Sequence, residues 1–393
     1  MITIRRDAAR IMQEMAKIHP TLTVAGPRHA GKTTLTKMLF PRYRYVNLED
    51  PDIREFARER PDEFFKYYEG DLVIDEFRLA PELIPRIRAM SCNDQRTERL
   101  VLTTSYKQLI MPGILLPPVR EPATMVLLPL SIRELNRAGY GLDRDQYIVR
   151  GFMPPAYEKK KKAPYNVYRE IYTQYMERDV RRLINLDNIG AFERFLKKLA
   201  GCVGQIINLN ALSEEVGVSQ TTLTTWIAVL ETSFIVFRLP PYFDDFGKRI
   251  VKTPKLYFTD VGLAAYLLGM TNPEQLPRDP FVGNLFENMV VTEALKSMYN
   301  SGRKGGLYYF RNQNRLEVDL LLTRGGKIMP MEIKYGETFE SSFARNIMLF
   351  RKLSDRIERG CVVYSGEYCV KESKREMPVF LNFKEMWRII NEP

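Results

Sequence analysis

The sequence predicts an α/β protein with a parallel sheet in its first third, a helical middle region and a second α/β unit at the end. Three patterns lead to this prediction. Short apolar runs alternate with polar helical stretches in the first third, a helix-turn-helix pattern follows, and a hairpin of alternating residues comes late. The length of 393 residues, at about 150 per domain, also favours two to three domains.

The composition is typical of a globular chain, with 45% hydrophobic and 27% charged residues. It excludes collagen-like, disordered and disulfide-scaffold proteins, and no apolar run approaches the ~20 residues that cross a bilayer. The first residues show no secretory signal, so we expect a cytoplasmic protein with no membrane partner. A Cys/His zinc site is not expected, because the only histidines are His19 and His29 and no CxxC pair occurs among Cys92, Cys202, Cys361 and Cys369.

The charge is strongly basic, with a formal net value of +11 and a pI near 9.3. Such a charge favours a polyanionic partner, and DNA is the expected one. A homo-oligomer or a protein partner is the alternative, since many basic proteins bind no nucleic acid. The lysine run at 158–164 is interpreted as an exposed loop, because such runs are more often solvated than bound to DNA.

The strands of the first sheet are predicted from apolar runs that are short and almost free of polar residues. Such runs are expected for parallel strands that are covered on both faces. The predicted strands are Leu22–Ala25, Tyr45–Leu48, Leu72–Asp75, Leu100–Thr103 and Met125–Leu128.

A phosphate-binding loop follows the first of these strands. Its glycines let backbone N–H groups face phosphate oxygens, and the helix that begins near Lys32 adds its positive dipole end. Lys32 is expected to reach the β- and γ-phosphates, and the Thr33 hydroxyl to bind Mg²⁺. The GxxxxGK[ST] pattern and the residue after it predict nucleotide contacts at Gly26, Pro27, Arg28, His29, Ala30, Gly31, Lys32, Thr33 and Thr34.

Two acidic residues end the third strand and complete the expected site. Asp75 would hold Mg²⁺ through water, and Glu76 would act as general base on the attacking water. Ser105, or its neighbour Thr104, ends the next strand and could orient that water or simply cap the strand. No guanine-reading NKxD motif is evident, so ATP is preferred over GTP.

The middle region is predicted to be helical over Tyr165–Leu186 and Ala191–Ala200. A helix-turn-helix is predicted next, with Gly217 in the turn and Ser219 capping the second helix. Strands at Ile235–Leu239 and Lys255–Phe258 would make it a winged helix. Its second helix would present the polar side chains of Gln220, Thr221, Thr224 and Thr225 to phosphates or base edges. Alternatively, the module could serve only for packing or protein contacts.

The last third contains a second group of charged residues. Glu287 lies in a helical pattern, Asp319 in a strand-like run, and Glu332 with Lys334 in the strand after the Gly325-Gly326 turn. Asp319, Glu332 and Glu287 could bind Mg²⁺ while Lys334 activates a water for phosphodiester attack. The spacing matches a PD-(D/E)xK nuclease core with Val318 in place of the usual proline. A plain hairpin with a surface ion pair is the alternative.

With these motifs in order, the chain resembles a prokaryotic family of AAA+-type ATPases that carry a C-terminal domain of unknown function. The resemblance implies an AAA-like ATPase domain, a winged-helix region and a nuclease-like fold. It rests on AGPRHAGKTTL (25–35), YVNLEDPDIREFA (45–57), LVIDEFRLAPELIPRIR (72–88), LVLTTS (100–105), LLPLSIREL (127–135), YMERDVRRL (175–183), KTPKLYFTDVGLAAYLLG (252–269), LFENMVVTEAL (285–295), EVDLLL (317–322) and PMEIKYG (330–336).

Two departures from the family pattern concern the ATPase site. Thr104 stands where members usually carry glycine, and Arg120 is the candidate transition-state arginine in a stretch that lacks the usual Gly-Arg. The expected organisation is a P-loop ATPase domain (1–140), a helical lid (141–205), a winged helix (206–262) and a nuclease-like domain (263–393). The expected function is ATP-driven action on DNA, with a nucleotide-switched binding protein or an ATP-gated nuclease as alternatives.

Overall fold

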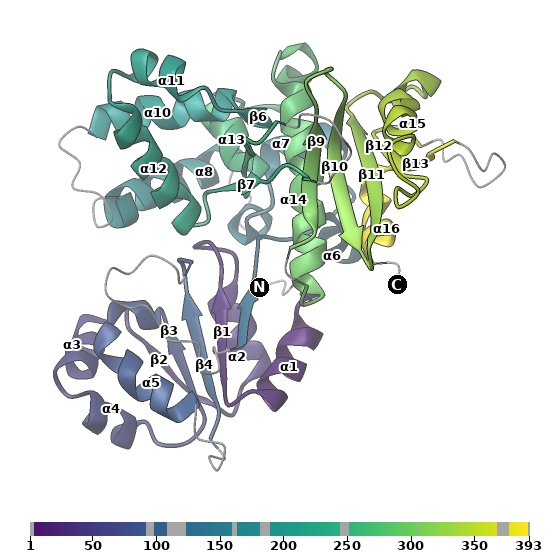
Figure 1. Cartoon of the computed structure of the whole chain (residues 1–393). Coiled ribbons are helices and arrows are strands. Elements are labelled where there is room, and N and C mark those ends of the chain that lie inside the picture. Colours follow the sequence, from purple (N-terminus) through teal and green to yellow (C-terminus); the bar gives the residue numbers. More distant parts are fainter. Residues whose placement is uncertain are drawn as a thin grey trace.

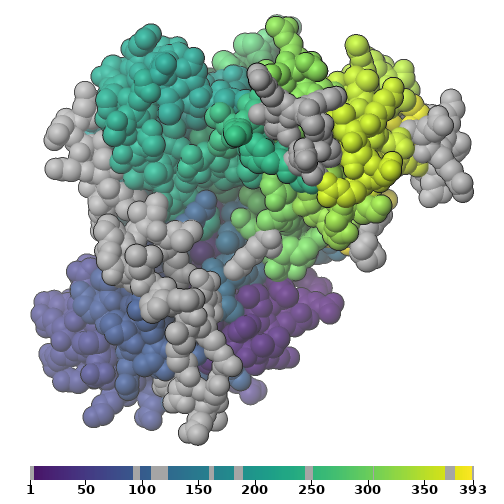
Figure 2. All heavy atoms as spheres, viewed as in Figure 1, coloured from purple at the N-terminus to yellow at the C-terminus, as the bar shows by residue number. Residues whose placement is uncertain are grey.

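The computed structural model describes residues 4–91, 98–107, 123–158, 163–180, 189–243, 251–303, 305–367 and 377–391. Figure 1 shows the first sheet and its helices as one unit and the later elements gathered above it. The space-filling view shows the same two masses, purple to blue below and teal to yellow above (Figure 2). Among the helices of these residues, none has both the length and the apolarity needed to span a bilayer.

The first sheet is parallel throughout, with strand order β2-β3-β4-β1-β5. Every residue of β1, β3 and β4 is buried, which confirms the expectation of strands covered on both faces. The strands lie within two residues of the predicted ranges: β1 (Thr21–Ala25), β2 (Arg44–Asn47), β3 (Leu72–Asp75), β4 (Leu100–Thr104) and β5 (Ala123–Val126).

Two apolar clusters pack on the opposite faces of this sheet, because alternate strand residues point to opposite sides. Ile74 and Leu102 face one cluster, whereas Val73 and Val101 face the other. The helices of this unit are α1 (Ala9–Ile18), α2 (Lys32–Leu39), α3 (Pro51–Glu59), α4 (Pro61–Tyr67) and α5 (Ile84–Ser91), with short 3₁₀ turns η1 (Phe77–Leu79) and η2 (Pro81–Leu83).

The middle region is helical, as expected, with a small antiparallel sheet of order β6-β8-β7. The predicted helix from Tyr165 begins as α8 and continues as a π-helical turn over Tyr175–Val180, and residues 181–188 lie outside the described residues. The first unit ends with α6 (Ile132–Arg137). The elements of the middle region are α7 (Arg144–Arg150), η3 (Pro154–Tyr157), α8 (Pro164–Gln174), η4 (Tyr175–Val180), α10 (Ile189–Gly201), β6 (Gln205–Ile206), α11 (Leu209–Val216), α12 (Gln220–Thr232), β7 (Val236–Leu239), β8 (Lys255–Phe258) and α13 (Val261–Leu267).

The helix-turn-helix forms where the sequence predicts it. Gly217 ends α11 with φ of +80°, a conformation that favours glycine, and the Ser219 side chain accepts the Thr222 N–H at the start of α12. Leu223 and Trp226 of α12 are buried. Both expected strands after it form β7 and β8.

The last unit contains a second mixed sheet beside the long helix α14. The strand order is β13-β12-β11-β10-β9, with β9, β10 and β11 antiparallel and β11, β12 and β13 parallel. The predicted Gly325-Gly326 turn joins β10 to β11. The elements are η5 (Pro273–Arg278), α14 (Val282–Asn300), β9 (Leu307–Arg311), β10 (Glu317–Arg324), β11 (Lys327–Lys334), η6 (Ser341–Ala344), α15 (Arg345–Arg351), β12 (Cys361–Tyr364), β13 (Val379–Asn382), η7 (Phe383–Glu385) and α16 (Trp387–Asn391).

One apolar core contains residues from Leu130 to Ile390, and two smaller clusters lie in the last unit, around Phe310 and around Val362. Helix α13 packs against α7, α8, α10 and α14, which joins the middle region to the last unit. The expected boundary between 205 and 206 falls inside β6, which pairs with β8. The regions expected at 141–205, 206–262 and 263–393 therefore share one core.

Candidate nucleotide-binding site

The phosphate-binding loop joins β1 to α2 and curls tightly at its glycines. A Cβ atom at Gly26 would lie 2.1 Å from the carbonyl oxygen of Leu127, so only glycine fits there. Gly31 caps α2 with φ of +92°. Because a helix lacks internal acceptors for its first N–H groups, those of Lys32, Thr33 and Thr34 are free to face an anion.

Lys32 is buried beneath the loop, and its ammonium group donates hydrogen bonds to three oxygen atoms. Its Nζ lies 2.9 Å from the Gly26 carbonyl oxygen, 3.0 Å from that of Pro27 and 3.0 Å from Ser105 Oγ. Burial lowers the pKa of Lys32, and the nearby Glu76, 3.9 Å from Nζ, opposes that shift. The loop therefore holds the ammonium beside the position expected for phosphates.

The Asp75 carboxylate accepts hydrogen bonds from three hydroxyl groups, which lie on one helix and two strands. Thr33 Oγ1 donates to its carboxylate at 2.7 Å, the Tyr45 hydroxyl donates at 2.6 Å, and Thr103 donates as well. Burial, followed by the Asp75 bond, raises the pKa of Tyr45, so Tyr45 stays a donor. The hard oxygens of Thr33 and Asp75 suit Mg²⁺, as the sequence predicts.

Glu76 and Ser105 meet at the ends of neighbouring strands. Strand β4 lies between β1 and β3, which places Ser105 between the loop and the Asp75-Glu76 pair. The Ser105 N–H donates to Glu76 Oε2 at 3.1 Å and its hydroxyl donates to Glu76 Oε1. Ser105 therefore contacts both Lys32 and Glu76. Glu76 has φ of +53°, a strained conformation of the kind that gathers at functional sites.

Two residues that the sequence reasoning did not select also hold the loop. Arg6 lies before α1, and its guanidinium contacts both Glu134 oxygens at 3.1 Å and the Ala30 carbonyl oxygen at 2.7 Å. Asp179 comes from the π-helical turn and lies 3.1 Å from Arg28 Nε. The only available signal for Asp179 was an acidic residue inside the YMERDVRRL segment.

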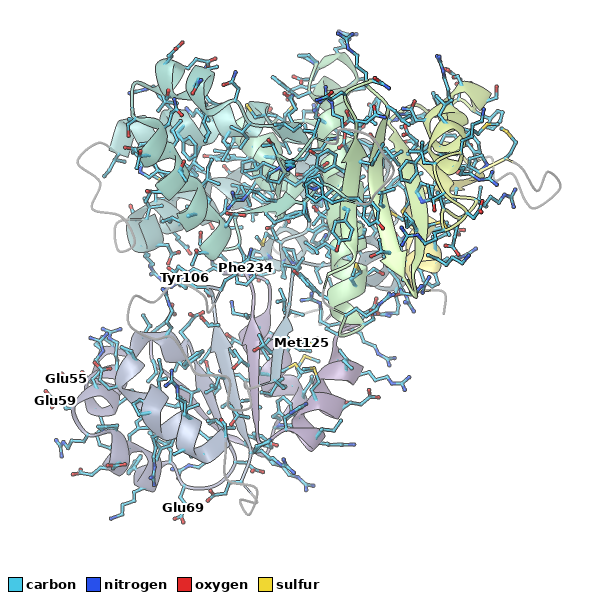
Figure 3. The ribbon with its side chains drawn as sticks, in the orientation of Figure 1. Glu55, Glu59, Glu69, Tyr106, Met125 and Phe234 are labelled. Carbon is cyan, nitrogen blue, oxygen red and sulfur yellow. The ribbon has the colours of Figure 1, made fainter. Side chains whose placement is uncertain are left out.

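The Asp179 contact connects the loop to the middle region. Asp179 also accepts from the hydroxyl of Tyr106, the residue after Ser105. Arg28 divides its guanidinium between Asp179 and Glu49, whose Oε1 lies 2.8 Å away. Figure 3 labels Tyr106 at the place where the two units meet. Burial, together with the charges of Arg28 and Lys32, lowers the pKa of His29, which favours its neutral form.

Two neighbouring cavities share Gly31, Thr34, Pro154 and Glu158 in their walls. The larger, about 300 Å³, contains Lys32, Thr33, Asp75, Glu76 and Ser105 and is mainly polar. The smaller, about 110 Å³, is mainly apolar, with Leu35, Met38, Leu130 and Tyr157. Residues of η3 complete both, so the middle region forms part of the site. Arg120 lies outside the described residues.

The three acidic residues of the predicted nuclease site form ion pairs with lysines. Glu287 on α14 accepts from Lys255 Nζ at 3.1 Å and from the Tyr257 hydroxyl at 2.6 Å. Lys334 Nζ lies 2.7 Å from Glu332 and 3.7 Å from Asp319. Glu332 and Lys334 share one face of β11, as the alternation predicts.

The expected magnesium shell of Glu287, Asp319 and Glu332 is not preformed. Within the described ranges, no three acidic, histidine or cysteine side chains are grouped so as to hold a metal ion. Two of these carboxylates are instead paired with lysines, since Lys255 Nζ lies 3.1 Å from Glu287 and Lys334 Nζ lies 2.7 Å from Glu332. Glu332 nevertheless keeps one buried oxygen, Oε1, without a hydrogen-bond partner.

The polar face of α12 is exposed, but two of its hydroxyl groups already donate hydrogen bonds within the helix. Gln220, Thr221, Thr224 and Thr225 all lie at the surface. Thr224 Oγ1 donates to the Gln220 carbonyl oxygen at 2.9 Å, and Thr225 Oγ1 donates to that of Thr221 at 3.1 Å. Each hydroxyl oxygen keeps its acceptor capacity.

Comparisons with known proteins agree with the geometry of the first unit. A family model described as an AAA domain matches residues 19–136, which contain the loop, Asp75, Glu76 and Ser105. The first unit is an AAA-type P-loop ATPase domain. Residues 142–274 and 282–383 match two domains of unknown function, DUF8612 and DUF4143.

Similar whole chains and solved structures also exist. Uncharacterized proteins of Mycobacterium bovis and Mycobacterium tuberculosis are each 28% identical over 374 residues, covering 94% of this chain and 81% of theirs. A Walker-type ATPase of Pyrococcus abyssi aligns with a TM-score of 0.43 at 12% identity, over 66% of this chain and 94% of that one.

Proposed function

We propose that this AAA-type ATPase couples ATP hydrolysis at the loop to action on, or binding of, DNA by the later units. The observation that carries the hydrolysis step is the chain of contacts from Lys32 through Ser105 to Glu76, beside Thr33 and Asp75. This chain brings a cation for the phosphates, oxygens for Mg²⁺ and a carboxylate base into one cavity.

Each residue then has a defined part in the reaction. Lys32 and the N–H groups of the first turn of α2 bind the phosphates, and the small apolar cavity takes the adenine. Glu76 accepts a proton from a water whose oxygen bonds to the γ-phosphorus while the bond to the ADP oxygen breaks. Ser105 orients Glu76 through its N–H and hydroxyl. Mg²⁺, held by Thr33 and Asp75, would neutralise charge on the phosphates.

The proposal of DNA rests on charge and on the shape of the middle region. The net charge is +11, and the elements α10, β6, α11, α12, β7 and β8 follow the order of a winged helix. The exposed face of α12 offers hydroxyl and amide groups of the kind that contact phosphates and base edges. No lysine or arginine stands among Gln220, Thr221, Thr224 and Thr225, which weakens direct base readout by this face.

The experiment that tests this function is ATP turnover measured with and without duplex DNA, for the wild type and for Asp75→Ala. We expect the wild type to hydrolyse ATP faster when DNA is present, with a stimulation that falls as salt rises. Asp75→Ala should lose turnover in both conditions. Turnover that ignores DNA at every salt concentration would contradict the DNA proposal and favour a protein partner.

A second candidate function, Mg²⁺-dependent phosphodiester cleavage, is favoured by the buried, unpartnered Oε1 of Glu332 beside Asp319. The order α14, β9, β10, β11, α15, β12 also agrees with a nuclease-like core. Nicking of a supercoiled plasmid that needs Mg²⁺ and disappears in Asp319→Ala and Lys334→Ala would support it. If plasmid, single-stranded DNA and RNA all remain uncut, the cleavage function is contradicted.

A further inference from the structure

Another cavity lies away from the ATPase loop, between the first unit and the last. Its volume is about 500 Å³, and its walls come from α1, α6, the end of α14 and α16. Figure 1 shows the end of α14 and helix α1 close together at this junction. Residues that bear on the argument are Arg133, Arg303, Arg324, Lys384 and Trp387.

The acidic residues in the walls are already engaged with other cations. Asp7 lies 2.7 Å from Arg137, which is not part of the cavity wall. Glu293 lies 2.7 Å from the buried Lys296, also outside the wall. The acids therefore leave most of the positive charge of the cavity without compensation.

The basic residues, by contrast, have few acidic partners. Arg303 bonds to the Ile390 carbonyl oxygen at 2.7 Å and to Ser301 Oγ at 3.0 Å, and to no carboxylate within the described chain. Within the described part of the chain, Arg324 and Lys384 form no ion pair. Burial first, and then the like charge of Arg324, lowers the pKa of Arg303. Cations gathered in this way repel one another until an anion joins them.

The cavity also fixes the orientation of a cation. The Arg133 guanidinium lies 4.2 Å from the centre of the Trp387 ring, and its link to Asp7 is long, at 3.8 Å. A guanidinium that packs on an aromatic ring still has N–H groups to donate to a planar or tetrahedral oxyanion. Arg133 belongs to the first unit and Arg303, Arg324 and Lys384 to the last, so an anion would contact both.

We propose that this cavity binds a small anion that carries a diphosphate group, such as free pyrophosphate or a nucleoside diphosphate. Guanidinium groups match phosphate oxygens with paired hydrogen bonds, and several cations favour a multivalent anion over a single carboxylate. The volume lies within the range for small-molecule pockets and excludes a duplex. The bound anion would link α1 and α6 of the ATPase unit to α14 and α16.

The test is calorimetric titration of full-length Lys32→Ala protein, in which the ATPase loop should bind phosphate groups at least tenfold more weakly and so competes less with the cavity. Inorganic pyrophosphate and ADP are titrated separately at low salt. Arg324→Gln with Lys384→Gln, in the same background, should weaken binding at least tenfold. The control Arg345→Gln, which removes one positive charge from an exposed position on α15 outside the cavity, should bind like its parent. Tighter binding of ADP would identify a nucleotide as the source, and tighter binding of pyrophosphate the free anion.

Three results would overturn the proposal. The first is equal affinity in the cavity variant and the Arg345→Gln control. The second is no heat of binding for either compound up to millimolar concentration. The third is displacement of bound pyrophosphate by a short duplex, which would assign the charge to nucleic acid. Thermal unfolding of each variant establishes that it is folded before titration, and Lys384→Gln alone provides a second variant if the double one is not.

Discussion

Glu76 is fixed by a single neighbour that also binds the lysine of the loop. Ser105 donates both its N–H and its hydroxyl to the Glu76 carboxylate and accepts from Lys32. The carboxylate therefore faces the cavity that also contains Thr33 and Asp75. A base held in this way can take a proton from water without first reorganising its surroundings.

Glu76→Gln should preserve ATP binding and lower the turnover rate by about 10²- to 10⁴-fold, because the amide keeps the shape but cannot accept the proton. The measurement is steady-state turnover beside equilibrium binding of ATP. Glu59→Gln is the matched control, since Figure 3 shows Glu59 on the outer side of the first unit, away from the cavity. Unchanged turnover in Glu76→Gln would exclude Glu76 as the base.

Glu332 should make the stability of the protein depend on pH. Burial, followed by the charge of Asp319, raises its pKa from 4.5 to about 8. The folded chain therefore holds a proton that the unfolded chain releases, so the free energy of unfolding should fall as pH rises from about 5 to about 8.

Glu332→Gln should remove that decline, because the amide does not titrate. The measurement is the urea midpoint at pH 6 and at pH 9, for the wild type, for Glu332→Gln and for the exposed control Glu358→Gln. A wild-type midpoint that falls no more steeply than that of Glu332→Gln would contradict the buried, protonated carboxyl.

At the scale of elements, the loop and the two hairpin strands were predictable because their signals are contiguous. The GxxxxGK[ST] string, the Gly217 and Ser219 caps and the Gly325-Gly326 turn each act on neighbouring residues. Tyr45, Thr103, Arg6 and Asp179 could not be found in the same way. Each reaches the site from a distant part of the chain. Apolar patterns predict that a residue is buried, but they do not show which distant residues it contacts.

The π-helical turn should hold the middle region to the ATPase loop through Asp179. Asp179→Asn keeps the size of the side chain but removes the charge that faces Arg28, and Arg28 is only partly compensated by Glu49. Breaking a buried pair costs about 3–5 kcal/mol, and the remaining Glu49 contact should reduce this loss to about 2 kcal/mol.

Urea unfolding measures this loss, with Glu177→Gln as control, an exposed acidic residue in the same turn. The control should unfold like the wild type. Equal midpoints for Asp179→Asn and Glu177→Gln would show that the Arg28 contact contributes nothing to stability.

For the whole molecule, the order of the parts was predictable from the sequence, whereas the packing of the later parts against one another was not. The sequence indicates a sheet, a helical middle and a second sheet, and the structure contains all of them. Most buried apolar residues of the later units join one core from Leu130 to Ile390, because α13 and α14 pack on the middle helices. Leu295 and Tyr299 of α14 also contact the apolar cluster at Ala25 and Leu128. The end of β1, which leads into the phosphate-binding loop, is therefore in direct contact with the last unit.

The central claim is that the loop at 26–33 binds ATP with Mg²⁺, and equilibrium titration of the full chain with ATP tests it most directly. The wild type should bind ATP in the presence of Mg²⁺, and Lys32→Ala should bind it at least tenfold more weakly because the buried ammonium is gone. Equal affinity for ATP in the wild type and in Lys32→Ala, with both proteins folded, would contradict the account.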